Sequence, residues 1–259
     1  MTETAPSAPH FVTVGADARR IAVRTTPGGD GRPGVLWCGG FLSDMLGTKA
    51  VELAAWGAAH DRRVVRFDYS GHGESEGAFI EGTISRWAED ALAVFDRETA
   101  GPQIVVGSSM GGWIALLLAR ALAARGDASR LAGLVLIAPA PDFTEELVWK
   151  AMTPEIRAEV MAKGVWYRAS DYGEPQPFTR ALIEDGRSNL VLGAPFAVGC
   201  PVRILQGVAD DTVPWQHAMK LVSCLAEDDV VVTLVKDGDH RLSRPEDIAR
   251  ILAAVEQIG

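Results

Sequence analysis

The chain is long enough for one sizeable domain, and its composition is that of a globular protein. It has 259 residues, of which 47% are hydrophobic and 23% are charged. The net charge of −9 argues against nucleic acid as a partner, because binding a phosphate backbone needs a basic surface. The sequence has no run of 18 apolar residues, so we expect no transmembrane helix and no stable membrane insertion.

The first residues of the chain and the spacing of its cysteines indicate in which cellular compartment we expect the protein. Residues 1–10 have neither the basic nor the apolar region of a secretory signal, and we expect them to form a flexible tail. The three cysteines include no C-x-x-C pair, which is typical of a reducing compartment and does not suggest a metal site. We therefore expect a cytoplasmic protein without a bound metal. The oligomeric state is open at this point.

Apolar runs of strand length alternate with amphipathic stretches of helix length along most of the chain. An antiparallel pair of strands is predicted first, over 11–14 and 20–25. Strands are then predicted over 34–37, 63–68, 104–107, 134–138, 201–206 and 230–235, and helices over 48–59, 83–99 and 113–124, with a further helix after each of the last two strands. This alternation predicts an α/β protein with a mostly parallel central sheet flanked by helices.

One long segment interrupts the alternation. Residues 142–195 contain helical pieces and turn signals, and no strand is predicted there. The segment has too many Trp, Tyr, Phe and Met residues for a solvated linker. We therefore expect a single domain over 11–259 in which 142–195 form a helical cap.

The pattern G-x-S-x-G, typical of a serine nucleophile, occurs twice. In the first copy Ser75 lies between Glu74 and Glu76, and no helix follows. Two carboxylates beside the serine would oppose the negative charge that builds up on an attacked carbonyl, so this copy is interpreted as a loop.

The second copy, centred on Ser109, has the context that the chemistry requires. A predicted strand runs into it and an apolar helix leaves it, which is the strand–turn–helix arrangement of a nucleophile elbow. The helix N-terminus adds a positive dipole end and free N–H groups. The alternatives are a glycine-rich turn packed on a sheet, or a phosphate loop, which would need a lysine that is missing here.

A serine hydroxyl needs a base to take its proton, and the position of each histidine narrows the choice. In folds with a nucleophile elbow the chain order is serine, acid, histidine. His240, after the last predicted strand, fits that order, and the alternative is that it is an ordinary surface histidine. The other histidines are His10 in the tail, His60 at a helix end, His72 in a turn and His217 at a helix start.

The acid is expected on the loop after the preceding strand. Asp210 has the better spacing there, whereas Asp211 is expected to cap the next helix. Asp142, after the strand that precedes the cap, is the reserve candidate. The acid would hold the imidazole in the correct tautomer and stabilise the imidazolium.

Two main-chain N–H groups should face the developing oxyanion. One is expected from Met110, the residue after the nucleophile, and the other from Phe41, which follows Gly39-Gly40 after the third strand. The alternative for the two glycines is a simple turn. The acyl pocket is expected among the tryptophans Trp149, Trp166 and Trp215.

Longer strings carry further information, and they lie at 40–45, 47–50, 66–71, 101–113, 163–166, 200–215 and 239–241. They resemble one branch of the α/β-hydrolase superfamily, that of the mitochondrial palmitoyl-protein thioesterase, which also cleaves mycophenolic acid acyl-glucuronide. The chain departs from it in having no Arg- and Ser-rich transit segment, Gly39 in place of Pro, and Met110 in place of Leu. The resemblance implies the α/β-hydrolase fold, with Ser109, Asp210 and His240 in the triad positions.

Together these features predict a serine esterase or thioesterase. Its partners would be small-molecule or acyl-protein esters and thioesters, cleaved through an acyl-enzyme without a metal or organic cofactor. The alternatives are other chemistry on the same fold, such as a perhydrolase or a C–C hydrolase, or a non-catalytic ligand-binding protein that keeps the pocket. A dehalogenase is disfavoured, because that reaction needs Asp where Ser109 stands.

Overall fold

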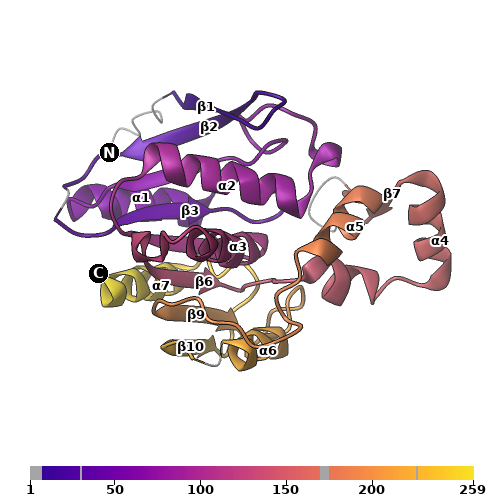
Figure 1. The fold of residues 1–259 in the computed structure, drawn as a ribbon. Helices are drawn as coiled ribbons and strands as arrows, with labels where there is room; N and C mark the ends of the chain where they lie inside the picture. Colours follow the sequence, from indigo (N-terminus) through magenta and orange to yellow (C-terminus); the bar gives the residue numbers. More distant parts are fainter. Residues whose placement is uncertain (1–7, 30, 170–174, 226) are drawn as a thin grey trace.

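The core of the molecule is a twisted sheet whose strands are mostly parallel (Figure 1). The computed structural model describes residues 8–29, 31–169, 175–225 and 227–259. Along the sheet the order is β1-β2-β4-β3-β5-β6-β9-β10, and only the pairs β1–β2 and β2–β4 are antiparallel. The strands are β1 His10–Val14, β2 Arg19–Thr26, β3 Gly34–Cys38, β4 Val64–Phe67, β5 Gln103–Ser108, β6 Leu131–Ile137, β9 Val202–Gly207 and β10 Val230–Val235.

Helices cover both faces of this sheet. The larger apolar cluster lies under α2 (Ile84–Glu98), α3 (Met110–Ala124) and α6 (Trp215–Cys224). The smaller cluster lies on the other face, under α1 (Thr48–Ala59) and α7 (Pro245–Ile258). The apolar sequence of α3 follows from its central place beside β5, where most of its side chains are buried.

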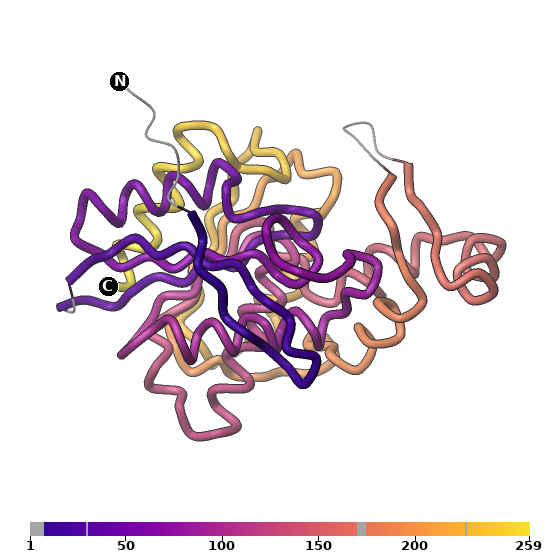
Figure 2. The backbone as a smooth tube through the Cα atoms, turned by 90° about the horizontal axis from the view of Figure 1, so that it is seen from above, coloured from indigo at the N-terminus to yellow at the C-terminus, as the bar shows by residue number. Residues whose placement is uncertain are grey.

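An excursion between β6 and β9 projects from one end of the sheet (Figures 1 and 2). It holds a π-helical turn, two helices and a hairpin: η3 Thr144–Trp149, α4 Pro154–Lys163, β7 Val165–Arg168, β8 Gln176–Thr179 and α5 Arg180–Ser188. We refer to residues 138–201, which include all of these elements, as the β6–β9 excursion.

The prediction that this excursion contains no strand was wrong, because β7 and β8 pair as an antiparallel hairpin. Each strand has only four residues, and Pro177 interrupts β8, so the sequence carries no clear strand signal. The hairpin is held by side-chain packing instead. The ring of Trp166 stacks on that of Phe178, which is fully buried against the main core.

The remaining predicted strands and helices have boundaries within about three residues of those observed, and the mostly parallel sheet is confirmed. At the N-terminus the predicted tail is too long at its inner end. His10 already pairs with Val23 in β1, and its imidazole lies 2.9 Å from the Glu98 carboxylate. Residues 1–7 of that predicted tail lie outside the described residues. In the described part of the chain, no helix is long and apolar enough to cross a membrane.

Candidate active site

Ser109 occupies a strained turn between β5 and α3. Its backbone has φ 54° and ψ −117°, which an L-residue adopts only at a cost, and it is the N-cap residue of α3. Glycines two positions away on either side make the turn possible. A Cβ on Gly107 would lie 2.4 Å from the Gly111 carbonyl oxygen, and a Cβ on Gly111 would lie 2.0 Å from the Cys38 carbonyl oxygen. The turn therefore presents the Ser109 side chain at the carboxyl end of the sheet, above a helix N-terminus.

Gly111→Ala tests this close approach. Helix propensity alone would favour alanine by about 1 kcal/mol. The clash with the Cys38 carbonyl involves backbone on both sides, so we expect a net loss of about 3 kcal/mol in the free energy of unfolding. Urea denaturation measures it. Gly31→Ala is the matched control, since a Cβ there meets nothing within 4 Å. Equal stability of the two variants would contradict the close approach.

Three side chains that are far apart in the sequence form a hydrogen-bonded line at this turn. His240 Nε2 lies 3.0 Å from Ser109 Oγ, and His240 Nδ1 lies 2.8 Å from Asp210 Oδ2. The Asp210 side chain has no exposed surface, while that of His240 is 24% exposed. A buried carboxylate thus faces one imidazole nitrogen, and the serine hydroxyl faces the other.

The two loops that carry the acid and the histidine are tied to each other. The Ala209 N–H donates to the Gly238 carbonyl over 3.0 Å, and a Cβ on Gly207 would lie 2.2 Å from the same oxygen. Lys49 of α1 adds a further tie, because its ammonium donates to the carbonyl of Arg241. The relative position of Asp210 and His240 is therefore determined by backbone contacts as well as by their own hydrogen bond.

The Asp210 carboxylate is surrounded by donors. Oδ1 accepts from the backbone N–H groups of Thr212 and Val213 at 2.9 and 2.8 Å, and Oδ2 accepts from Gln206 Nε2 at 3.1 Å in addition to His240. Hydrogen bonds of this kind hold the carboxylate in one orientation. Gln206 is a supporting residue that the sequence did not reveal.

The other acidic candidates lie elsewhere. Asp142, the reserve acid, accepts from the N–H groups of Val191 and Leu192 at 2.8 to 3.1 Å, and therefore ties the end of the β6–β9 excursion to its beginning. Burial raises the pKa of the Asp142 carboxyl. Asp211 does not cap the next helix as expected, because α6 begins at Trp215 with Pro214 as its N-cap residue.

The alternative serine and histidine are also accounted for. Ser75 lies in a loop, where its hydroxyl donates to the Asp68 carbonyl and accepts from the Ala22 N–H. His217 is buried on α6, and its Nε2 lies 2.7 Å from the Pro141 carbonyl oxygen. Both side chains are occupied by contacts to the main chain.

The loop after β3 lies directly beside the serine. A Cβ on Gly40 would lie 3.5 Å from Ser109 Cβ, so the next residue, Phe41, begins its chain within reach of the nucleophile. In the described part of the chain, the backbone N–H groups of Phe41 and Met110 donate to no protein acceptor. One main-chain donor without a protein acceptor thus lies in the loop after β3, and another lies directly after Ser109.

His72 is a supporting residue that sequence reasoning interpreted as part of a turn. It is buried, its Nε2 accepts from the Leu42 N–H at 3.3 Å, and its Nδ1 lies 3.3 Å from the Ser70 carbonyl oxygen. These contacts require a neutral ring with the proton on Nδ1. Burial lowers the pKa of His72 from its ordinary 6.5 to about 4, so the ring stays neutral at physiological pH. His72 thus fixes the loop that carries Phe41.

This histidine should make the fold less stable in mild acid. Because its folded pKa lies below its unfolded pKa, its contribution is complete above pH 6.5 and is lost as the pH falls toward 4. Between pH 7 and 4.5 we expect wild-type protein to lose about 2–3 kcal/mol more than His72→Gln, which cannot titrate. Urea denaturation at both pH values measures the difference. The same loss in both proteins would remove His72 as its source.

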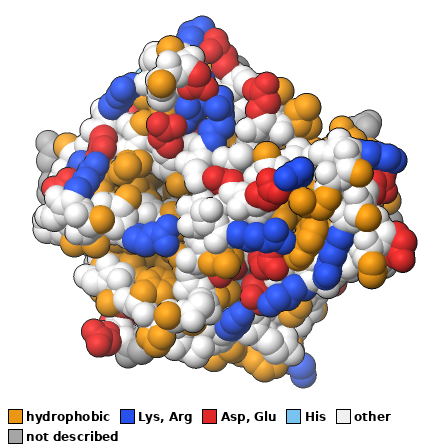
Figure 3. All heavy atoms as spheres, turned by 45° about the vertical axis from the view of Figure 1, so that its right-hand side comes forward, with side chains coloured by type: hydrophobic (Ala, Val, Ile, Leu, Met, Phe, Trp, Pro, Cys, Tyr) orange, Lys and Arg blue, Asp and Glu red, His pale blue; other side chains and the backbone are white. Residues whose placement is uncertain are grey.

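Aromatic rings line the region next to this loop. The ring of Phe41 stacks on Phe178 of β8 with centroids 5.4 Å apart, and it meets Phe79 and Phe143 edge-on at 4.9 and 5.6 Å. Trp166 extends the cluster through its own stacking contact with Phe178. We call Phe41, Phe79, Phe143, Phe178 and Trp166 the aromatic cluster. Hydrophobic side chains also lie in patches between Lys and Arg on the molecular face shown in Figure 3.

The three tryptophans expected in the acyl pocket lie in different surroundings. Trp166 belongs to the aromatic cluster. The ring of Trp149 is approached by the guanidinium groups of Arg187 and Arg157, at 4.7 and 5.2 Å from its centroid. Trp215 is half-buried at the first position of α6. Sequence reasoning counted Phe178 among the aromatic residues of the predicted cap, but it did not single Phe178 out as a pocket residue beside the three tryptophans.

Comparison with models of known protein families identifies the family of the chain. The alpha/beta hydrolase family model matches residues 28–251, which include β3 to β10, the serine turn and His240. The chain belongs to the alpha/beta hydrolase family. Within the described residues, no group of three His, Cys, Asp or Glu side chains is arranged to hold a metal ion.

Similar individual proteins show which branch of this family the chain resembles. The chain is 35% identical over 228 residues to the human mitochondrial palmitoyl-protein thioesterase ABHD10, covering 87% of this chain and 72% of that protein. Its structure matches mouse alpha/beta hydrolase domain-containing protein 10 with a TM-score of 0.85 and 32% identity, over 97% of this chain and 98% of the mouse chain. A putative hydrolase from Agrobacterium vitis S4 matches with a TM-score of 0.93 and 53% identity, over 98% and 99% of the two chains. The resemblance to the thioesterase branch is therefore confirmed.

Proposed function

We propose that the protein is a serine hydrolase that cleaves carboxylic esters or thioesters of acyl groups, with Ser109, His240 and Asp210 as its catalytic triad. The observation that carries the proposal is the hydrogen-bonded line from Asp210 Oδ2 through the His240 ring to Ser109 Oγ. Hydrolase activity is also supported by the family and by the thioesterase relatives.

The geometry supports a two-step mechanism. His240 Nε2 takes the Ser109 proton as Oγ attacks the carbonyl carbon, and Asp210 stabilises the imidazolium that forms. The tetrahedral oxyanion accepts hydrogen bonds from the N–H groups of Phe41 and Met110. The imidazolium then protonates the leaving alcohol or thiol, and the acyl group remains on Ser109 as an ester. Water, deprotonated by His240, hydrolyses that ester and releases the carboxylic acid.

The surroundings of Ser109 favour an apolar acyl group. Phe41 supplies both the proposed oxyanion donor, through its N–H, and an aromatic ring close to that donor. The aromatic cluster continues from this ring onto the hairpin of the β6–β9 excursion. We therefore assign to this excursion, predicted as 142–195, the role of a cap over the acyl chain. The human and mouse relatives are named as palmitoyl-protein thioesterases, which fits an acyl-protein substrate.

The substrate class can be measured directly. Matched series of acyl esters and acyl-thioesters from two to sixteen carbons should show kcat/KM rising with chain length, because each methylene that enters the apolar pocket adds about 0.8 kcal/mol. Ser109→Ala is the blank. Flat kcat/KM over the whole series would contradict an apolar acyl site at the aromatic cluster.

The same assays separate the alternatives. A C–C hydrolase or a perhydrolase would prefer its own substrates over every ester in the series by a large factor. A non-catalytic binding protein would turn over none of them and would not react with a fluorophosphonate probe. The cytoplasmic location stays a prediction, since the mammalian relatives are named as mitochondrial.

A further inference from the structure

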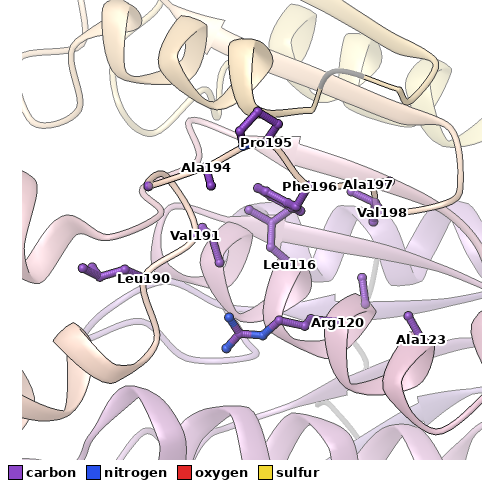
Figure 4. Close-up of a pocket in the computed structure, with 12 residues that line it drawn as sticks. Leu116, Arg120, Ala123, Leu190, Val191, Ala194, Pro195, Phe196, Ala197 and Val198 are labelled. Carbon is purple, nitrogen blue, oxygen red and sulfur yellow. The ribbon is translucent and has the colours of Figure 1, made fainter.

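A cavity lies away from the serine turn, between α3 and the end of the β6–β9 excursion (Figure 4). Its volume is about 380 Å³. Side chains of α3 form its floor, and residues 190–198, which run between α5 and β9 without helix or strand, form its wall. The lining residues are Leu116, Ala119, Arg120, Ala123, Leu190, Val191, Gly193, Ala194, Pro195, Phe196, Ala197 and Val198.

This cavity is distinct from the proposed catalytic centre. Leu116 and Ala123 lie 7 and 14 residues beyond Ser109 in α3, which places them about 10 and 20 Å farther along the helix axis. None of Ser109, Asp210 and His240 lines the cavity.

Hydrogen bonds hold the wall in place. Asp142 accepts from the N–H groups of Val191 and Leu192, and the Phe196 N–H donates to the Cys224 carbonyl at 2.9 Å. Farther along, Asp228 accepts from the N–H groups of Val198 and Gly199, both at 2.8 Å. The wall is thus fastened at both ends, and the cavity does not depend on a ligand to keep it open.

The side chains that line the cavity suit a ligand with an apolar chain and a negatively charged end group. Arg120 alone among the lining residues is charged, and the others are apolar or glycine. It extends from α3 on the side of the cavity where Val191 and Leu190 lie (Figure 4). Arg120 is exposed, and within the described residues no carboxylate or other partner is recorded for its guanidinium. Most other arginines of this acidic chain have such partners, for example Arg125 with Asp96.

The volume sets the size of the occupant. A cavity of about 150 Å³ lined by apolar side chains holds one benzene ring, and ligand pockets begin at about 300 Å³. A space of about 380 Å³ therefore accommodates an alkyl chain of roughly eight to twelve carbons, but not a folded peptide or a second domain.

We propose that this cavity is a second ligand site, separate from the catalytic one, that binds a free medium-chain fatty carboxylate. The alkyl chain lies against Leu116, Ala119 and Phe196, and the carboxylate pairs with the Arg120 guanidinium at the rim. The proposal does not depend on the role of Ser109, because no catalytic residue takes part in it.

Calorimetric titration of the full chain with decanoate tests the site. Arg120→Gln should weaken decanoate binding by about tenfold, since it removes a charge-assisted hydrogen bond. Ala123→Trp should abolish the same binding event, because the indole fills one end of the cavity. Both residues are exposed, so neither change should disturb the core, and unchanged ester turnover and circular dichroism verify that. Arg125→Gln is the matched control and should bind as wild type, because Arg125 lies five residues farther, at the C-cap of α3, and is paired with Asp96.

Two further measurements, the affinity of an uncharged analogue and the position of a bound ligand, could overturn the proposal. Decanol should bind at least tenfold more weakly than decanoate, and equal affinity would overturn the anionic class. A crystal soaked with 10-bromodecanoate should show bromine between α3 and residues 190–198. Bromine only at the aromatic cluster, or decanoate binding that is unchanged in both Arg120→Gln and Ala123→Trp, would overturn the site itself.

Discussion

Ser109→Ala is expected to lower kcat/KM by about five orders of magnitude and to abolish labelling by a fluorophosphonate probe. The substitution removes the only atom of the hydrogen-bonded line that can form the acyl-enzyme, Oγ at 3.0 Å from His240 Nε2. The residual rate should come from binding and from the donors of Phe41 and Met110. The measurement is turnover of an acyl ester together with probe labelling detected by intact mass.

Ser75→Ala is the matched control for this prediction, because Ser75 is the serine of the other G-x-S-x-G copy. Its hydroxyl is committed to the Asp68 carbonyl and the Ala22 N–H, so we expect a modest loss of stability and full labelling. Labelling that persists in Ser109→Ala but disappears in Ser75→Ala would reverse the assignment of the nucleophile.

Asp210→Asn is expected to lower kcat by about 10³- to 10⁴-fold with little change in KM. All the contacts of this carboxylate, from Thr212, Val213, Gln206 and His240, come from donors. An amide has only one acceptor oxygen. When that oxygen accepts from the N–H groups of Thr212 and Val213, the NH₂ faces His240 Nδ1, which must then accept, so the ring has the wrong tautomer and the imidazolium loses its carboxylate. Steady-state kinetics on one ester, at saturating and at low substrate, separates kcat from KM.

Asp142→Asn provides the comparison, since Asp142 is also buried and also accepts main-chain N–H groups. Its partners are Val191 and Leu192 rather than a histidine, so we expect a loss of stability and less than a tenfold change in kcat. A larger effect on kcat from Asp142→Asn than from Asp210→Asn would make the reserve candidate the acid.

Elements that are specified by their own sequence were predicted correctly, whereas an element held by contacts with distant residues was missed. The helix over residues 48–59 and the strand over 230–235 appear with the predicted boundaries, because apolar periodicity within one element is enough to specify it. The hairpin of β7 and β8 was missed, because four-residue strands containing Pro177 are stabilised by the contact of Trp166 with Phe178 and not by their own pattern.

The same distinction applies to the site. The serine turn could be predicted because Gly107, Ser109 and Gly111 are close in sequence. The tight turn leaves no room for a side chain at the two positions that are glycine. His72 and Gln206 could not be recognised as supports. Each acts through a partner on another loop, Leu42 for His72 and Asp210 for Gln206, and a single sequence does not state which loops meet.

By itself, the sequence determined the class of fold, the strained serine turn, and the residues that could serve as base and acid. These follow from local periodicity, from glycine spacing and from the order of elements along a parallel sheet. Only the tertiary structure decided that Asp210 rather than Asp142 meets His240, that Phe178 joins Phe41, and that Arg120 lies beside a cavity without a partner among the described residues. Contacts of this kind depend on how separate loops and helices pack, and the free energy of that packing is a property of the whole folded chain.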